Sequence, residues 1–336
     1  MTERPFGVWV SAARMAVVVF CIAVVSAACE PAEEPELRIG LSPWIGYSYF
    51  SVANERGYTA DSDALNLEIV EVASQRDAVR AFERGQVDLI GATLAELADI
   101  KAGGRRSARA VLALDRSVGG DVIIARKDIE TLDALKGQRV GLEPGTVNML
   151  VLAAAARQGG FGFDDVTMVS LPQSEMAAAL EEGRIDAAIT YPPITSGVLE
   201  QPGTHVVFDT SMAPNAVVDV LVAAEAVIEN QPRALEALIE DHDRALRWSQ
   251  ASPEPARAII AAHTGLSPRA VDQVHGYIEV LPVEEQLGLW ATDGTLIDGL
   301  RRVMDIRAEL YDQPEGTAVD VASMLDRTFV ERLGSR

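Results

Sequence analysis

The sequence predicts an α/β protein built from two similar lobes. The segments 75–88 (QRDAVRAFERGQVD) and 173–186 (QSEMAAALEEGRID) start 98 positions apart and share one pattern. In each, a helix is closed by glycine and a short apolar strand is then opened by aspartate. A second pair of similar segments, 38–43 (RIGLSP) and 139–144 (RVGLEP), precedes them. We therefore expect two copies of one strand–helix–strand–helix–strand unit.

The elements of the first copy follow from the periodicity of its apolar residues. A period of two predicts a strand and a period of 3.6 predicts a helix. The expected strands are 37–41, 65–72, the strand opened by Asp88, 108–114 and 121–125. The expected helices are 47–57, 75–85 and 94–101. Residues 115–120 interrupt the pattern and are expected to lead the chain out of the first copy.

The second copy repeats this order. The expected helices are 128–135, capped by Asp128, an alanine-rich helix from Gly145 to Gly160, the helix of 173–183, and 193–200. The expected strands are 139–142, 166–171, 187–191, 206–209 and 219–223. The segments Asp121–Ala125 and Asp219–Ala223 are alike and again 98 positions apart. We expect them to be the two strands that cross between the lobes.

Almost all of the remaining chain has helical periodicity. The expected helices are 231–250, 253–264, 267–278, 283–290, 294–311 and 317–333. This C-terminal helical set is assigned to the first lobe, which then consists of residues 37–118 and 224–336. The second lobe consists of residues 119–223. A chain of 336 residues is long enough for each lobe to have its own core.

The N-terminus has the pattern of an export signal. Arg4 and Arg14 precede an uncharged apolar run, Met15–Ala28, which is shorter than the roughly 20 residues that span a bilayer. Small residues then lead to Cys29, as in a bacterial lipobox, so residues 1–28 are expected to be a lipoprotein signal peptide. Residues 29–36 would be a lipid anchor and tether, although secretion with an incidental cysteine is the alternative. We expect a cell-envelope protein that faces the periplasm or lies on the outer face of the cytoplasmic membrane.

Composition argues against several function classes. Cys21 lies in the expected signal and Cys29 is the expected lipid site, so the mature domain has no thiol for a disulfide, a metal or a nucleophile. The net charge of −21 makes a nucleic acid an improbable partner. The histidines show no metal-ligand spacing, and the chain has no nucleophile elbow, phosphate loop or dinucleotide fingerprint. We expect no catalytic residue, metal or cofactor.

Candidate binding residues lie where the expected strands end, because parallel sheets bind ligands outside the carboxyl ends of their strands. Thr93 and Thr146 stand where helices begin, so they are either ordinary caps or part of an anion site. Trp44 and Tyr191 follow matching strands of the two lobes and either wall a cleft or belong to the core. Asp115 either caps a turn or pairs with a ligand amine or a pocket arginine. The full candidate set is Ser42, Trp44, Tyr47, Thr93, Asp115, Ser117, Thr146 and Tyr191.

Three segments resemble a known family. They are 37–47 (LRIGLSPWIGY), 135–146 (LKGQRVGLEPGT) and 174–191 (SEMAAALEEGRIDAAITY). They resemble the substrate-binding components of ABC transporters in the nitrate/sulfonate/taurine group, over about residues 36–250. The resemblance implies a type II periplasmic-binding-protein fold, in which two lobes joined by two crossing strands close on a solute. It also implies a small anionic or zwitterionic solute, a monomer and a membrane permease as partner.

One departure bears on the solute. Except for Arg116, no arginine stands at an expected strand end that faces the cleft. A sulfonate or nitrate site is expected to contain such an arginine. A zwitterion such as taurine, or a neutral heterocycle between Trp44 and Tyr191, therefore stays open. Two other functions were considered: a membrane-tethered solute sensor, and an enzyme like the pyrimidine-precursor synthases. The latter requires a cysteine-rich iron motif, which this chain lacks.

Overall fold

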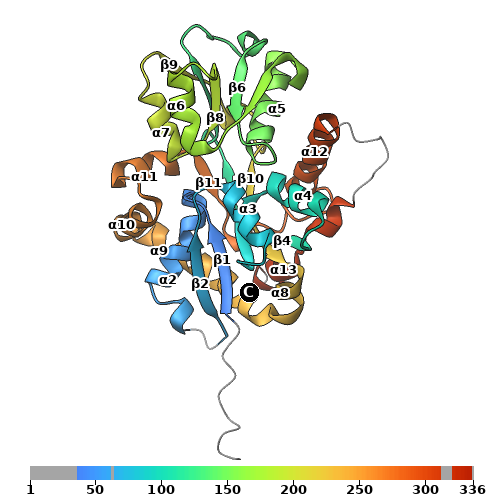
Figure 1. Cartoon of the computed structure of the whole chain (residues 1–336). Coiled ribbons are helices and arrows are strands. Elements are labelled where there is room, and N and C mark those ends of the chain that lie inside the picture. The colour runs from blue at the N-terminus through green and yellow to red at the C-terminus, as the bar shows by residue number, and fades with distance from the viewer. Residues whose placement is uncertain (1–35, 62–63, 312–319, 335–336) are drawn as a thin grey trace, which may run out of the picture. The chain divides into compact units, whose positions relative to one another are not determined.

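Two mixed β-sheets organise the computed structural model, which describes residues 36–61, 64–311 and 320–334 (Figure 1). The strand order is β11-β4-β10-β3-β1-β2 in the first sheet and β7-β6-β8-β5-β9 in the second. We call each sheet with its helices a lobe. The predicted class, two α/β lobes with a C-terminal helical set, is confirmed. The expected signal peptide, Cys29 and the tether lie outside the described residues.

The first sheet combines parallel and antiparallel strands. Its strands are β1 (Glu36–Leu41), β2 (Asn66–Glu71), β3 (Leu89–Thr93), β4 (Ala108–Ser117), β10 (Val218–Ala224) and β11 (Ile278–Val280). β1 and β3 are parallel, but β10 lies antiparallel between β3 and β4. The strand–helix–strand units of the sequence predict mainly parallel sheets; this prediction is wrong, because β10 and β11 are antiparallel to β4. The starting end of β10 lies beside the carboxyl ends of β3 and β4.

The second sheet repeats this arrangement. Its strands are β5 (Val122–Arg126), β6 (Arg139–Leu142), β7 (Thr167–Ser170), β8 (Ala187–Thr190) and β9 (Thr204–Asp209). β6 is parallel to β7 and β8, whereas β5 runs antiparallel between β8 and β9. In each sheet an antiparallel strand, β10 or β5, lies between two others and begins at the cleft; in the first sheet the edge strand β11 is also antiparallel to β4.

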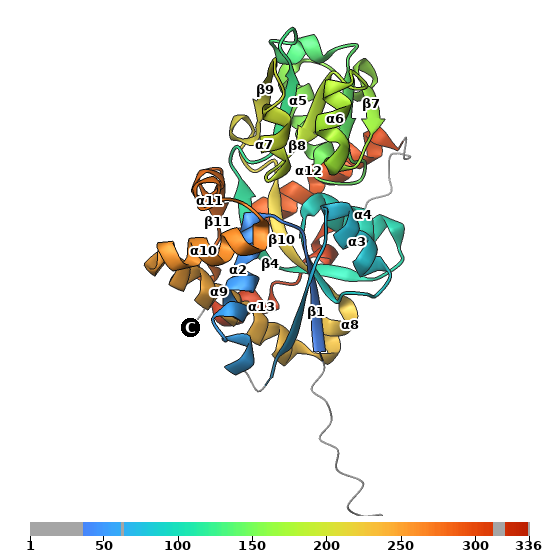
Figure 2. The same ribbon diagram turned by 60° about the vertical axis from the view of Figure 1, so that its left-hand side comes forward.

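The chain passes between the sheets twice, at residues 118–121 and 210–217 (Figure 2). The segments expected to cross, Asp121–Ala125 and Asp219–Ala223, form strands that each pair within one sheet, β5 in the second and β10 in the first. The crossings therefore lie next to these strands and not in them. We propose that residues 37–118 and 224–336 form the first lobe and that residues 119–223 form the second. β10, at the end of the second range, pairs into the sheet of the first lobe.

Helices cover both sheets. They are α2 (Ser48–Glu55), α3 (Gln75–Glu83), α4 (Leu94–Gly103), α5 (Asn148–Gly159), α6 (Met176–Glu181), α7 (Ile194–Leu199), α8 (Glu225–Asn230), α9 (Pro232–Ala251), α10 (Pro253–Thr264), α11 (Pro268–His275), α12 (Thr295–Leu310) and α13 (Thr328–Leu333). α9 and α10 pack on α2, and α13 packs on β4. α12 contacts both α4 and α5 and so touches both lobes (Figures 1 and 2).

Two expected helices are wrong, and a third, 317–333, forms an α-helix only over Thr328–Leu333 among its described residues. In 128–135 only a 3-10 turn forms, Leu132–Leu135, because Asp128 pairs with Arg126 and caps nothing. In 283–290 only the 3-10 turn Val283–Glu285 forms. There the side chain of Gln286 bonds to the backbone N–H and C=O of Ala113 in β4, which fixes the segment against the sheet. The sequence analysis also missed α8 and β11.

The repeat recurs as matched ion pairs at the strand ends away from the cleft. Asp88 Oδ2 accepts hydrogen bonds from the backbone N–H and Nε of Arg38, at 3.2 and 3.0 Å. Asp186 Oδ2 accepts the same two bonds from Arg139, at 2.9 and 2.8 Å. The two aspartates shared by the repeated segments are therefore structural in both lobes.

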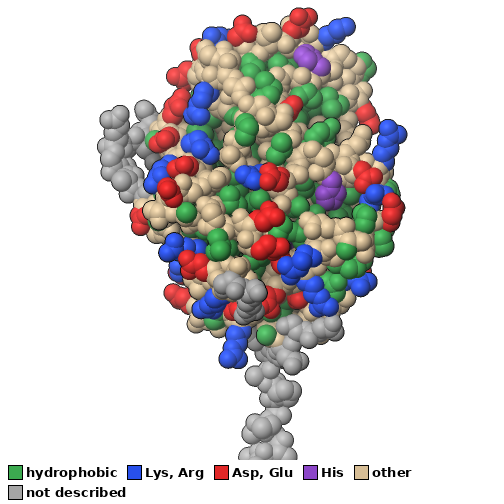
Figure 3. All heavy atoms as spheres, turned by 180° about the vertical axis from the view of Figure 1, so that it is seen from behind, with side chains coloured by type: hydrophobic (Ala, Val, Ile, Leu, Met, Phe, Trp, Pro, Cys, Tyr) green, Lys and Arg blue, Asp and Glu red, His purple; other side chains and the backbone are tan. Residues whose placement is uncertain are grey.

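The surface carries both signs of charge. On the face in Figure 3, acidic and basic side chains are interspersed over both lobes. Within the described ranges, no helix has the length and apolar character needed to cross a membrane.

Candidate functional site

A small pocket lies between the two lobes, where strands of both sheets begin or end. It is lined by Ser42, Trp44, Gln75, Thr93, Asp121, Val147, Tyr191, Val217 and Asp219. We call it the inter-lobe pocket. Its free volume is about 10 Å³, which is the space of roughly one water molecule. A solute of several atoms enters only if the lobes move apart.

Trp44 lines this pocket and contacts residues of both lobes. It follows β1, and its indole Nε1 donates to both carboxylate oxygens of Asp115 in β4, at 3.2 and 3.1 Å. Its ring meets the ring of Tyr191 edge-on, with centroids 6.4 Å apart. Gly46 makes room for this pair, because a Cβ there would lie 1.7 Å from Asp115 Oδ2. The hydrogen bond between Trp44 and Asp115 therefore requires a residue without a side chain at position 46.

A network of four buried side chains holds Asp219 at the pocket wall. The hydroxyl of Tyr47 donates to Asp219, which begins β10. Gln75 Nε2 donates to the same hydroxyl at 2.6 Å, and Ser42 Oγ donates to Gln75 Oε1 at 3.1 Å. All four side chains are buried. The network fixes the carboxylate of Asp219 at the pocket wall.

The start of α5 is joined to α4 by a carboxylate. Thr93 and Glu96 form a capping box at the start of α4, in which Glu96 Oε2 accepts from the backbone N–H of Thr93 at 2.8 Å. The other oxygen, Oε1, accepts from the backbone N–H of Val147 at 2.8 Å. The helix start that the sequence analysis considered for an anion is therefore occupied by Glu96 of the other lobe.

Asp121 lies immediately before β5. Its backbone N–H donates to Ser117 Oγ at 3.1 Å, and Ser117 in turn shares a hydrogen bond with Thr210 at 2.8 Å. These bonds join the two crossings of the chain. The side chain of Asp121 lines the pocket and is 4% exposed.

Buried carboxyl groups give the pocket its electrostatic character. Burial raises the pKa of Asp115 to about 8, although the hydrogen bond from Trp44 opposes this. Burial likewise raises the pKa of Asp121 to about 7 and the pKa of Asp219 well above its usual value, and nearby Asp115 adds to the latter. The pKa of Glu96 is also raised by burial. No lysine, arginine or histidine lines the pocket among the described residues, so the site suits positively charged or hydrogen-bond-donating groups.

The structure divides the predicted site residues into three groups. Those that line the pocket are Ser42, Trp44, Thr93 and Tyr191. Those buried directly behind it are Tyr47, Asp115 and Ser117. Thr146 lies outside both groups: it donates to the carbonyl of Glu143 at 2.8 Å and lines a separate groove.

Sequence reasoning missed five pocket-lining residues and Glu96. The five are Gln75, Asp121, Val147, Val217 and Asp219. The rule that ligands meet the carboxyl ends of strands fails for Asp121 and Asp219, because β5 and β10 run antiparallel and begin at the cleft. A signal was present, since these aspartates open two similar segments 98 positions apart.

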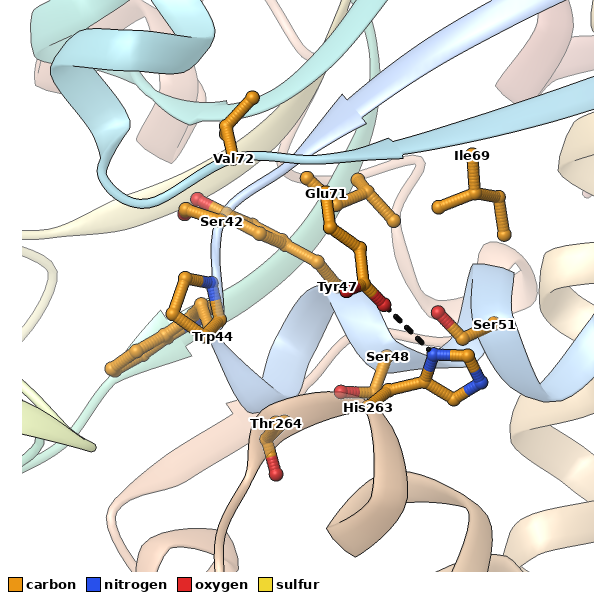
Figure 4. Close-up of a pocket in the computed structure, with 12 residues that line it drawn as sticks. Ser42, Trp44, Tyr47, Ser48, Ser51, Ile69, Glu71, Val72, His263 and Thr264 are labelled. Carbon is orange, nitrogen blue, oxygen red and sulfur yellow. Dashed lines mark hydrogen bonds and ion pairs between the residues drawn. The ribbon is translucent and has the colours of Figure 1, made fainter.

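A larger pocket, with a free volume of about 80 Å³, shares Ser42 and Trp44 with the inter-lobe pocket (Figure 4). It is lined by β1, β2, α2 and the end of α10, where His263 Nδ1 lies 3.1 Å from Glu71 Oε1. All of these elements belong to the first lobe. A solute there would contact one lobe and could not drive closure, so the inter-lobe pocket is the better candidate. Among the residues described, no three or more His, Cys, Asp or Glu side chains are arranged to hold a metal.

Comparison with known proteins agrees with this geometry. The model of the NMT1-like family matches residues 30–264. A Brucella abortus protein named as a binding protein is 26% identical over 248 residues, which cover 68% of this chain and 72% of the relative.

Two solved structures share the fold. The alkanesulfonate-binding protein SsuA from Xanthomonas axonopodis pv. citri has a TM-score of 0.72 at 18% identity, covering 88% of this chain and all of that one. The nitrate-binding protein NrtA from Synechocystis has a TM-score of 0.70 at 14% identity, covering 90% and 89%. The expected periplasmic-binding-protein fold is thereby confirmed.

Proposed function

The chain belongs to the NMT1-like family, and from this premise we propose that it is the solute-binding component of an ABC importer. In this role it captures a small solute outside the cytoplasm and delivers it to a membrane permease. One observation carries the proposal: both lobes wall a pocket whose free volume, about 10 Å³, is too small for solute entry without opening. A pocket of this kind couples solute binding to lobe movement.

Opening would be a hinge motion about the two crossings, residues 118–121 and 210–217. The contacts that separate on opening lie on both sides of the pocket. They are the bond from Val147 to Glu96, the edge-on rings of Trp44 and Tyr191, and the bond from Arg76 to the carbonyl of Pro144 at 2.9 Å. A solute that touches both lobes favours the closed form by its difference in affinity for the two states.

The solute class and the cell location extend the proposal. The solved relatives are named for sulfonates and nitrate, and the sequence analysis expects a small anionic or zwitterionic solute. We propose a monomer that is exported and anchored through Cys29, so that it stays close to its permease. We propose that the chain binds its solute without catalysis, because the Brucella relative and the two solved structures are named as binding proteins.

The test is a thermal-shift and calorimetric screen against sulfonates, taurine, nitrate, pyrimidines and amino acids. A solute at 100 times its Kd raises the free energy of unfolding by about 2.7 kcal/mol. Trp44→Ala should abolish the shift, whereas Met168→Ala, which removes an exposed side chain on β7, should not. Solute that binds both variants equally would mean a site elsewhere. A chain that binds no member of the panel would argue against a solute-binding role.

A further inference from the structure

Three aspartates converge on the inter-lobe pocket from three strand ends. Asp115 lies near the end of β4, directly opposite Asp219 at the start of β10, and Asp121 immediately precedes β5. Two of them, Asp121 and Asp219, line the pocket, and all three are at most 4% exposed. Both sheets therefore aim buried carboxyl groups at one small space.

These aspartates differ from the other buried aspartates in the described chain. Asp186 is paired with Arg126 and Arg139, and Asp243 is paired with Arg247. The three aspartates at the pocket have no cationic partner. Asp115 accepts from the indole of Trp44, Asp219 accepts from the hydroxyl of Tyr47, and Asp121 has the hydroxyl of Ser117 nearby. A buried carboxyl group without a positive partner is either protonated or paired with a cation from outside the chain, so this arrangement favours a cationic ligand.

A second, independent feature of the pocket also lacks a partner. The hydroxyl of Tyr191 is buried, and the side chain is 5% exposed. The backbone of Gln75 lies near its oxygen in poor geometry, and its proton has no acceptor among the described residues. Tyr191 belongs to the pocket lining, on the lobe opposite Trp44. Nearly all buried polar groups are satisfied, so an unsatisfied hydroxyl at a pocket wall points to a hydrogen-bonding group of a ligand.

The features that would hold an anion are already occupied. The N–H of Val147 at the start of α5 donates to Glu96. Arg116, the arginine at the strand ends, bonds to Glu279 and to Asn215 instead of turning to the pocket. A purely anionic solute would thus meet several buried acids and no compensating charge.

We propose that the inter-lobe pocket recognises a positively charged nitrogen, a protonated amine of an organic cation or zwitterion. Asp121 and Asp219 accept its N–H groups, Tyr191 supplies a further hydrogen bond, and the rings of Trp44 and Tyr191 flank the charge. This inference rests on the proposed function as a solute-binding protein and specifies its solute.

The experiment compares matched probes on the full chain purified in detergent. Taurine carries an ammonium and a sulfonate, isethionate replaces the ammonium by a hydroxyl, and ethanolamine replaces the sulfonate by a hydroxyl. The panel is widened with polyamines, quaternary ammonium compounds, amino acids, alkanesulfonates and nitrate. Binding is measured by calorimetry at pH 7.5, together with the melting temperature of each complex.

We expect every binder to carry a positively charged nitrogen and its loss to weaken binding at least a hundredfold. Asp121→Asn should weaken binding of the best amine at least tenfold without lowering the melting temperature of the free protein. The exposed control Asp128→Asn makes the same charge change outside the pocket and should leave Kd unchanged. Binding of isethionate, an alkanesulfonate or nitrate at least as tight as that of the amines would overturn the inference but leave the importer function standing. Absence of binding by every probe of either charge would overturn both.

Discussion

The carboxylate of Glu96 accepts a hydrogen bond from the backbone N–H of Val147 across the lobe boundary, at 2.8 Å. Glu96 is fully buried, and it also completes the capping box of α4 through the N–H of Thr93. One side chain therefore satisfies the starts of two helices, one in each lobe, with the favourable sign for both helix dipoles. It links the closed arrangement of the lobes to the local stability of α4.

Glu96→Ala is expected to loosen closure as well as to destabilise the chain. It removes a cap and a bond between the lobes, so the free energy of unfolding should fall by about 1–3 kcal/mol. Small-angle scattering should show a larger radius of gyration for the variant without solute. The control Ser267→Ala removes a cap bond within α11 alone, so it should lower stability without changing the radius. Equal radii for Glu96→Ala and the wild type would contradict a role in closure.

Stability without solute is expected to fall as the pH rises from about 4 to about 8. The folded-state pKa values of Asp115 and Asp121, about 8 and about 7, lie above those of the unfolded chain. The folded protein therefore binds more protons, and the stability present below the unfolded pKa is lost as the pH rises through the folded pKa. Urea denaturation at pH 6 and pH 9 should differ by on the order of 2 kcal/mol.

Asp121→Asn tests the origin of that loss. The variant cannot ionise at this position, so it should be more stable than the wild type at pH 9, with a flatter dependence on pH. Asp128→Asn, at an exposed aspartate, should follow the wild-type curve. A pH dependence that is identical in wild type and Asp121→Asn would mean that the burial of this carboxyl does not control stability.

The sequence predicted the fold well because the repeat is carried by local patterns. The glycine that ends each repeated helix and the aspartate that opens the next strand recur as matched structures, down to the Arg38–Asp88 and Arg139–Asp186 ion pairs. The segment 283–290 could not be predicted correctly, because a distant contact decides it. Gln286 bonds to β4, which lies 173 positions away.

The site was predicted less completely than the fold, because it depends on strand direction. Trp44, Thr93 and Tyr191 follow strands that end at the cleft, so the rule for parallel sheets found them. Asp121 and Asp219 begin antiparallel strands, and periodicity does not show direction. The hydrogen bond between Glu96 and the start of α5 could not be predicted, because it depends on how the two lobes contact each other.

Affinity for an amine is expected to increase with pH, if the inference about the solute holds. Below pH 7 the pocket aspartates are partly protonated, so binding a cation requires proton release. Between pH 6 and 8.5, Kd for an amine that stays protonated should fall by about 10- to 100-fold, since each released proton contributes up to tenfold per pH unit. Calorimetry in buffers of different ionisation enthalpy would count the protons. A Kd that is constant or rises with pH would contradict recognition by these carboxyl groups.

Gly46→Ala is expected to disrupt the site through a single methyl group. The added Cβ would lie 1.7 Å from Asp115 Oδ2 and 3.0 Å from Trp44 Nε1, so the bond between these side chains cannot survive unchanged. Overpacking of this kind costs about 1–3 kcal/mol, measured by urea denaturation, and should also weaken solute binding. The control Gly197→Ala, in α7, meets no atom within 4 Å and should not lower stability. Because the clash is with the carboxylate, Asp115→Ala should relieve much of the loss when combined with Gly46→Ala. A double variant as unstable as the sum of the two single variants would show that the strain lies in the backbone of the loop and not in the tryptophan–aspartate contact.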